Sequence, residues 1–132
     1  MTTISKLIDS KVDANEQLHK EKLKKGLNKL LQVEDWQAPT FVNSWANVSG
    51  YEAGYYKDPW GRVYLKGVLG TGTSGTVAFT LPVGYRPSES LLFPALQTSA
   101  TAGAYVDVNT DGTVNLVRTG TTIFINNVSF RV

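Results

Sequence analysis

The stretch AYVDVNTDGTVNLVR, residues 104–118, decides the fold class of this chain. Valine and leucine recur at alternate positions on both sides of Asp111 and Gly112. Alternation with a period of two is typical of a β-strand that buries one face, and Asp-Gly between two such runs favours a tight hairpin turn. The stretch therefore predicts two antiparallel strands joined by a turn at 109–112.

The same pattern continues outward from this hairpin over most of the chain. Short runs of β-branched and aromatic residues alternate with turn residues, which is typical of an antiparallel β-sandwich, a jelly roll or a barrel. Residues 58–61, Asp-Pro-Trp-Gly, place proline and glycine where a type I turn favours them. The last run has a candidate break at Asn126 and Asn127. We expect about eight strands, with cores at 41–48, 55–57, 62–69, 76–81, 91–96, 104–108, 113–118 and 122–131.

The composition of the chain changes at Trp36. All aromatic residues, all five prolines and all but one of the twelve glycines lie at or beyond this residue, whereas the preceding segment is mostly Lys, Glu, Asp, Leu and Asn. The sequence therefore predicts a helical appendage at 1–35 and a β head at 36–132. The fold class is mainly β, a β-sandwich or jelly-roll-like head preceded by an N-terminal α-helical segment. A head of this length can bury a core of its own.

Apolar residues in the appendage recur about every 3.7 residues, close to the period of an α-helix. A helix this polar is marginal in water by itself, so we expect it to pack on copies of itself or on the head. Asn15 and His19 would then be the polar positions that set register and strand number. His19 is alternatively a metal ligand or a catalytic base, although no cysteine or second histidine accompanies it. The predicted oligomerisation seam consists of Ile4, Ile8, Val12, Asn15, His19, Leu23, Leu27 and Leu30.

Charge and composition exclude some functions. The net charge of +2 is nearly balanced in both parts, so we expect no nucleic-acid binding. One basic cluster in the appendage is either a solvated helix face or a contact for phosphate or anionic lipid. It consists of Lys20, Lys22, Lys24, Lys25 and Lys29 around Glu21. The absence of cysteine excludes disulfides and thiolate chemistry. Residues 1–20 contain no continuous apolar run, so we expect no signal peptide and no membrane insertion.

No motif predicts a metal, a cofactor or a catalytic centre. Residues 107–112 fit the start of a calcium loop, but Arg118 stands where the bidentate Glu is needed. The glycine-rich segment 70–75 precedes a predicted strand rather than the helix of a phosphate loop. The head has no His or Cys to activate a serine, which leaves only Ser-Lys or Thr variants open. Its carboxyl groups show no paired spacing, so we expect a non-catalytic protein; they are Glu52, Asp58, Glu89, Asp107 and Asp111.

Recognition is the function that remains. Aromatic side chains and one arginine gather around the predicted turn at 58–61, a chemistry that stacks on sugar faces or anchors a protein partner. Alternatively, these rings fill the core of the head. The candidate ligand-binding residues are Tyr51, Tyr55, Tyr56, Trp60 and Arg62.

Four segments of the head carry a family resemblance. YKDPWGRVYLKG at 56–67, FTLPVGYRP at 79–87, VDVNTDGTV at 106–114 and the strand at 125–131 follow one another in this order. Together they resemble the head module at the C-termini of tail-fibre and receptor-binding proteins of long-tailed bacteriophages of Gram-positive, Bacillus-type hosts. The resemblance covers about residues 36–132 and leaves out the appendage.

The resemblance implies a β-sandwich head, often trimeric, on a virion tail or baseplate assembled in the host cytoplasm. Such a head contacts host cell-wall polysaccharide or a surface protein, and it carries over no catalytic or binding residues. A short helix here stands in place of a long fibre shaft. We therefore hold three hypotheses: a homotrimeric phage receptor-binding protein, a structural adaptor or accessory protein of the tail, and a monomeric stand-alone carbohydrate-binding module.

Overall fold

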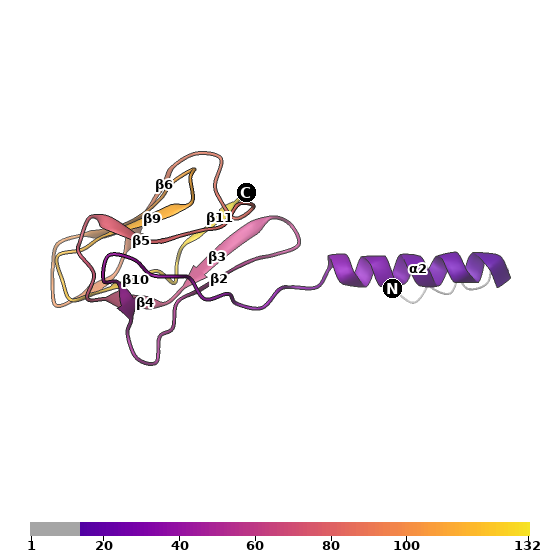
Figure 1. The fold of residues 1–132 in the computed structure, drawn as a ribbon, viewed down its shortest axis with the longest axis horizontal. Helices are drawn as coiled ribbons and strands as arrows, with labels where there is room; N and C mark the ends of the chain where they lie inside the picture. The colour runs from indigo at the N-terminus through magenta and orange to yellow at the C-terminus, as the bar shows by residue number, and fades with distance from the viewer. Residues whose placement is uncertain (1–13) are drawn as a thin grey trace. The chain divides into compact units, whose positions relative to one another are not determined.

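A computed structural model describes residues 14–132 of the protein (Figure 1). The chain divides between Val33 and Glu34 into two compact units, two residues before the boundary expected at Trp36. The second unit, Glu34–Val132, is called the β unit below. The predicted seam residues Ile4, Ile8 and Val12 lie outside the described residues.

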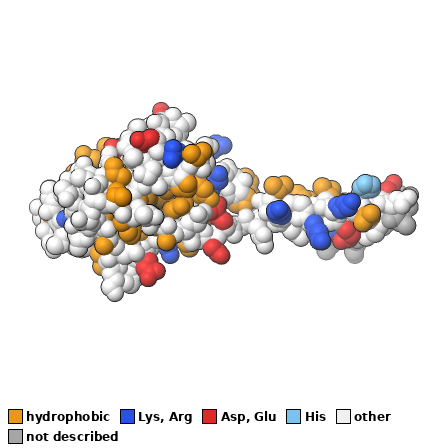
Figure 2. All heavy atoms as spheres, viewed as in Figure 1, with side chains coloured by type: hydrophobic (Ala, Val, Ile, Leu, Met, Phe, Trp, Pro, Cys, Tyr) orange, Lys and Arg blue, Asp and Glu red, His pale blue; other side chains and the backbone are white. Residues whose placement is uncertain are grey.

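The first unit contains helix α2 (Ala14–Leu30). Its leucine side chains are largely exposed: Leu18, Leu23, Leu27 and Leu30 expose 50–70% of their surface. His19 is also exposed. Figure 2 shows lysine and hydrophobic side chains side by side along this helix. At 100° per residue, Leu23, Leu27 and Leu30 form a narrow apolar stripe on one side of the helix, and Leu18 lies on the other side.

The β unit consists of three antiparallel sheets. Their strands within residues 14–132 are β1 (Ala46–Asn47), β2 (Gly54–Lys57), β3 (Arg62–Lys66), β4 (Val68–Gly70), β5 (Thr76–Thr80), β6 (Leu91–Ala95), β7 (Gln97–Thr98), β8 (Ala104–Val108), β9 (Thr113–Val117), β10 (Thr122–Phe124) and β11 (Ser129–Arg131). The strand orders are β1-β4-β10-β7, β11-β3-β2 and β5-β9-β8-β6. Figure 1 shows the antiparallel strands of the unit, and the predicted β-sandwich with a preceding helix is confirmed.

The first two sheets are joined into one layer. In two places the chain leaves a strand of one sheet and directly enters a strand of the other. β3 continues into β4 through Gly67, and β10 continues into β11 through a loop at Asn126. The Asn126 side chain accepts a hydrogen bond of 2.7 Å from the Gly67 backbone N–H, and the Gly67 carbonyl accepts one of 3.0 Å from the Ile125 N–H. The predicted break near Asn126 is confirmed.

Gly67 also corrects the sequence prediction, since the single strand expected at 62–69 is interrupted there. Its φ is +127°, a backbone conformation that residues with a Cβ rarely adopt. A Cβ at this position would lie 2.6 Å from the Cα of Ala53. The chain therefore turns here in close contact with the segment before β2.

The prediction of a strand at 41–48 is wrong for most of this segment, because only Ala46–Asn47 forms a strand. Asn43 and Ser44 have φ values of +56° and +65°, which interrupt an extended chain. This turn places Trp45 in the core, where its indole N–H donates to the Thr76 hydroxyl at 3.1 Å. The run expected at 91–96 likewise ends at Ala95, and β7 is a separate short strand.

The core lies between the two layers and takes residues from both. Alternate residues point inward in β3, β8 and β9; in β3, Val63 and Leu65 are buried while their neighbours are partly exposed. The largest fully buried side chains are Phe79, Leu65, Leu69, Leu81, Leu116, Ile123, Ile125, Val63, Val106, Val108, Val114 and Val128.

Two hairpins of the β unit have the same turn. In the hairpin at 104–118, β8 pairs with β9, and the Gly112 N–H donates to the Asn109 carbonyl at 2.9 Å. In the hairpin of β2 and β3, the Gly61 N–H donates to the Asp58 carbonyl at 3.1 Å. Both glycines have positive φ, as in a three-residue hairpin loop that ends in a bulge. The hairpin predicted at 104–118 is confirmed.

The segment that enters the β unit is attached to strand β2. Gln37 exchanges backbone hydrogen bonds of 2.8 and 3.0 Å with Tyr55. The Tyr85 hydroxyl donates to the Glu34 carboxylate, 2.7 Å from Oε2, and accepts from the Gln37 amide at 2.9 Å. Burial, followed by the Glu34 hydrogen bond, raises the pKa of Tyr85. Residues 34–37 are therefore part of the folded unit.

Candidate recognition site

The candidate site lies on the outward side of the sheet β11-β3-β2, opposite the core. Tyr64 in β3 is paired with Tyr56 in β2 and with Ser129 in β11. Because side chains alternate along a strand, these three lie on the side away from buried Val63 and Leu65. We call this side of the sheet the outer face.

A row of aromatic rings crosses the outer face. Tyr56 stacks on Tyr64 with ring centroids 5.0 Å apart and an interplanar angle of 16°. Trp36 meets Tyr56 edge-on at 4.5 Å, and the Lys66 ammonium lies 4.9 Å from the centre of the Trp36 ring. Gly54 makes room for the indole, since a Cβ there would lie 3.3 Å from Trp36 Cε3. Each ring is thus held by its neighbours.

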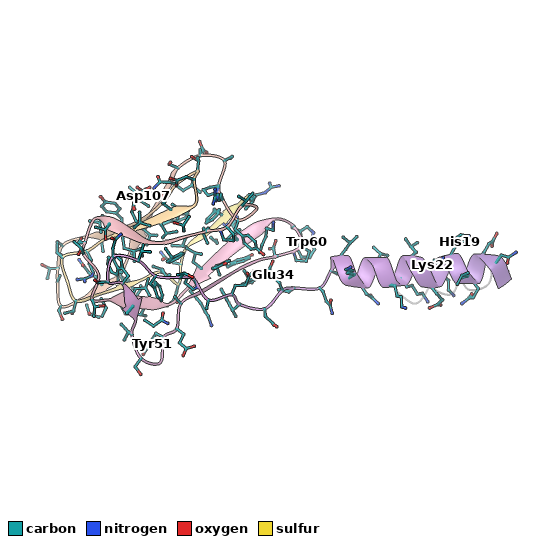
Figure 3. All side chains as sticks on the ribbon, in the orientation of Figure 1. His19, Lys22, Glu34, Tyr51, Trp60 and Asp107 are labelled. Carbon is teal, nitrogen blue, oxygen red and sulfur yellow. The ribbon has the colours of Figure 1, made fainter. Side chains whose placement is uncertain are left out.

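Beside this row, the hairpin turn forms one wall of a hollow of about 470 Å³. The hollow is lined by Asp58, Trp60, Arg62 and Arg131. Trp60 exposes 74% of its surface at the tip of the turn, which Figure 3 shows beyond the ends of β2 and β3. An indole with a free face is unusual in a folded protein, where most large aromatic rings are well buried. This ring is available to a ligand.

Asp58 holds the turn in shape and has little capacity left for a ligand. Its Oδ1 accepts hydrogen bonds from the backbone N–H groups of Trp60 at 3.0 Å and Arg62 at 2.9 Å. Its Oδ2 accepts one from the Tyr64 hydroxyl at 3.2 Å. The hydrogen bond from the Arg62 backbone is the largest cause of a lowered pKa of Asp58, and the bonds from Trp60 and Tyr64 act in the same direction.

This lowered pKa predicts an acid-dependent contribution to stability. Because the folded-state pKa lies below the unfolded one, the carboxylate stabilises the fold fully above the ordinary Asp value of about 3.9. That contribution is lost as the pH falls through the lower folded-state pKa of Asp58. In urea unfolding, Asp58→Asn should be less stable than wild type at pH 7, and the difference should shrink toward pH 2. Tyr64→Phe, which keeps both backbone bonds, should retain most of this pH dependence; a difference that does not change with pH contradicts the prediction.

Two arginines lie side by side in the hollow. Arg62 in β3 and Arg131 in β11 are directly opposite each other in the strand pairing. The Nε and Nη2 groups of Arg62 donate to the Ser129 hydroxyl at 3.2 and 2.9 Å. The Arg131 guanidinium makes no hydrogen bond or ion pair with any side chain of residues 14–132.

Of the five predicted ligand-binding residues, Trp60 and Arg62 line the hollow, and Tyr56 stacks on Tyr64 in the neighbouring row of rings. Tyr55 points to the other side of β2, where it packs against the core and meets Tyr85 edge-on at 5.4 Å. Tyr51 exposes 57% of its surface but lies on the loop before β2, away from Trp60 in Figure 3. The aromatic residues therefore divide among the outer face, the core and a separate loop.

Sequence reasoning missed Trp36 and Arg131. Trp36 is the first residue of the predicted head, and only the structure shows its ring against Tyr56. Arg131 joins the site only because β11 pairs with β3, and no local signal in the sequence reveals that pairing. A long-range pairing has to be known before such a residue can be found.

The other motifs have structural roles in the described residues. Asp111 of the partial calcium motif accepts hydrogen bonds from the Thr113 N–H at 3.0 Å and hydroxyl at 2.6 Å. In the glycine-rich loop, the Gly75 N–H donates to the Leu116 carbonyl at 2.8 Å, and the Gly72 carbonyl accepts from Arg118 at 2.7 Å. Within residues 14–132, no three His, Cys, Asp or Glu side chains gather as a metal site. The one helix in this part of the chain is too short and polar to span a membrane.

Comparisons with family models, curated proteins and solved structures give no significant match to this chain. The geometry of the outer face and the resemblance of the head segments are therefore the basis for a function.

Proposed function

We propose that this protein is a non-catalytic receptor-binding protein of a bacteriophage tail, in which the outer face of each β unit binds a glycan or protein on the host cell surface. The main support for this proposal is the exposure of Trp60, whose indole is 74% exposed in a hollow that Arg62 and Arg131 also line. A free aromatic face stacks on the apolar side of a sugar ring, and flanking polar groups fix its orientation. Among these ligands a glycan fits best.

The arrangement of the carboxyl groups supports recognition rather than hydrolysis. Asp58 is the one carboxylate in the Trp60 hollow, and its oxygens already accept three hydrogen bonds within the hairpin. Its lowered pKa keeps it ionised, which is unsuited to a general acid. Glycoside hydrolysis by the common route needs two carboxyl groups about one sugar, one of them protonated.

The helix supports an oligomer built from copies of this chain. A helix of 17 residues has little stability of its own in water, and its leucines are exposed among the described residues. Three chains joined through their helices would present three outer faces to one surface. Linked sites act at a high effective concentration, so weak contacts to single sugars suffice for firm attachment to a cell.

A comparison of two exposed aromatic residues tests the glycan site. Trp60→Ala should weaken binding to the recognised glycan about thirtyfold or more, the loss of about 2 kcal/mol that a central aromatic anchor typically contributes. Tyr51→Ala removes a ring of similar exposure from the separate loop and should leave binding unchanged. Binding is measured by isothermal titration calorimetry with hits from an array of bacterial surface glycans.

Two results would count against this proposal. If purified oligomer binds no glycan on the array and no isolated cell wall, the structural-adaptor hypothesis takes its place, to be tested by pull-down with tail and baseplate proteins. If Tyr51→Ala weakens binding and Trp60→Ala does not, the site lies on the loop before β2.

A further inference from the structure

The two arginines on the outer face share their hollow with one carboxylate, Asp58, whose charge interacts with that of Arg62. Arg62 and Arg131 are directly opposite each other on neighbouring strands, an arrangement in which like charges destabilise a sheet. Arg62 is held toward Ser129 by two hydrogen bonds, whereas the Arg131 guanidinium has no partner within residues 14–132. The nearby Asp58 carboxylate is engaged inside its own hairpin. An anion placed between these guanidinium groups would relieve their repulsion.

A second hollow begins on the other side of Arg131. It has a volume of about 390 Å³ and lies between β11 and the segment that leads into β6. Its lining residues are Pro87, Ser88, Glu89, Leu91, Leu92, Phe93, Ser129, Phe130 and Arg131. Because Arg131 lines both this hollow and the Trp60 hollow, the two adjoin at this residue. Each volume is within the range that small ligands occupy in proteins.

We infer that the two hollows are neighbouring subsites for an anionic glycan chain, with one sugar against Trp60, the next in the second hollow, and an acidic group at Arg62 and Arg131. This inference rests on the proposed function and specifies its ligand. A guanidinium binds carboxylate or phosphate oxygens with two parallel hydrogen bonds, and within residues 14–132 the Arg131 guanidinium lines the hollow without an acceptor of its own. The recognised unit is therefore charged and at least two sugars long.

The lining of the second hollow fits a sugar better than an acidic peptide. Ser88 and Glu89 offer a hydroxyl and a carboxylate at its rim, both of which accept hydrogen bonds from sugar hydroxyls. Leu92, which is 64% exposed, adds an apolar contact. A peptide rich in carboxylates would place some of them near Glu89, whereas a glycan with one acidic group per repeat can hold that group in the Trp60 hollow, which Glu89 does not line.

The test compares neutral, uronate-containing and phosphodiester-linked oligosaccharides of one to six sugars on an array, followed by titration calorimetry at two salt concentrations. Wild type should bind acidic chains of two or more sugars, and higher salt should weaken binding. Arg131→Gln should weaken it at least tenfold. Lys22→Gln removes the same charge from the helix and should have no effect. The preference between the uronate and phosphodiester arms identifies the anion.

A stability measurement separates a binding role of Arg131 from a structural one. Since the substitution removes repulsion from Arg62, Arg131→Gln should melt at the same temperature as wild type or higher. A lower melting temperature with unchanged binding overturns the inference. The inference is also overturned if the protein binds neutral glycans, and if Trp60→Ala abolishes that binding while Arg131→Gln leaves it intact. That result would leave the proposed function standing. Absence of any glycan binding overturns both, and Arg131-dependent binding of poly-glutamate would replace the glycan with an acidic peptide.

Discussion

Gly67→Ala should destabilise the protein by about 3 kcal/mol or more. The added methyl group would enter a backbone conformation with φ of +127°, which costs about 1–3 kcal/mol for a residue other than glycine. It would also lie 2.6 Å from the Cα of Ala53, and a displaced backbone in a packed interior adds about 1–3 kcal/mol. Thermal unfolding followed by circular dichroism should show a midpoint lower by more than about 10 °C.

Gly103→Ala is the matched control for this substitution. A Cβ at Gly103 meets no atom within 4 Å, and this glycine does not have a positive φ. Its midpoint should therefore stay close to that of wild type. Equal midpoints for the two variants would show that the close approach at the joint between β3 and β4 does not constrain the fold.

Replacing three helix leucines by glutamine should convert the proposed trimer into a monomer. Leu23, Leu27 and Leu30 lie within one third of the helix circumference at 100° per residue, and each is at least half exposed. Glutamine has nearly the same helix propensity as leucine, so the change removes apolar contact with little direct cost to the helix. Light scattering after gel filtration should give about three times 14.4 kDa for wild type and 14.4 kDa for the variant.

The control removes three charges from another side of the same helix. Lys22, Lys25 and Lys29 fall on a different face from the three leucines, and their change to glutamine should leave the mass unchanged. A wild-type mass of one chain at high concentration would end the stalk hypothesis and leave the monomeric carbohydrate-binding module. Dissociation of the lysine variant alone would place the contact on the basic side of the helix.

Local signals predicted the parts of the fold whose structure is determined locally. The hairpin at 104–118 was predicted because alternation and the Asp-Gly turn both lie within fifteen residues of sequence, and the turn at 58–61 for the same reason. The segment 41–48 was predicted wrongly because burial of Trp45 against Thr76 imposes a turn on residues with β propensity. Tertiary packing determines the backbone of this segment, and the local sequence pattern does not reveal that packing.

The candidate site was predictable only in part for a related reason. Trp60, Arg62 and Tyr56 belong to one hairpin, so a cluster around a turn could be inferred from spacing. Which rings face outward depends on the register of β2 against β3. This register places Tyr56 on the outer face and Tyr55 on the side of the core. Arg131 and the second hollow come from segments that are distant in sequence and meet only through the pairing of β11 with β3.

The attachment of Gln37 to Tyr55 has a consequence for how the protein avoids aggregation. β2 is the last strand of its sheet, and an unpaired strand edge invites pairing with another chain. The backbone of Gln37 occupies both hydrogen-bonding groups of Tyr55, at the middle of that edge, and the Trp36 indole covers the adjoining Gly54. The few residues that lead into the β unit thus cover the edge of β2. Neighbouring copies in an oligomer are therefore kept from pairing their sheets edge to edge.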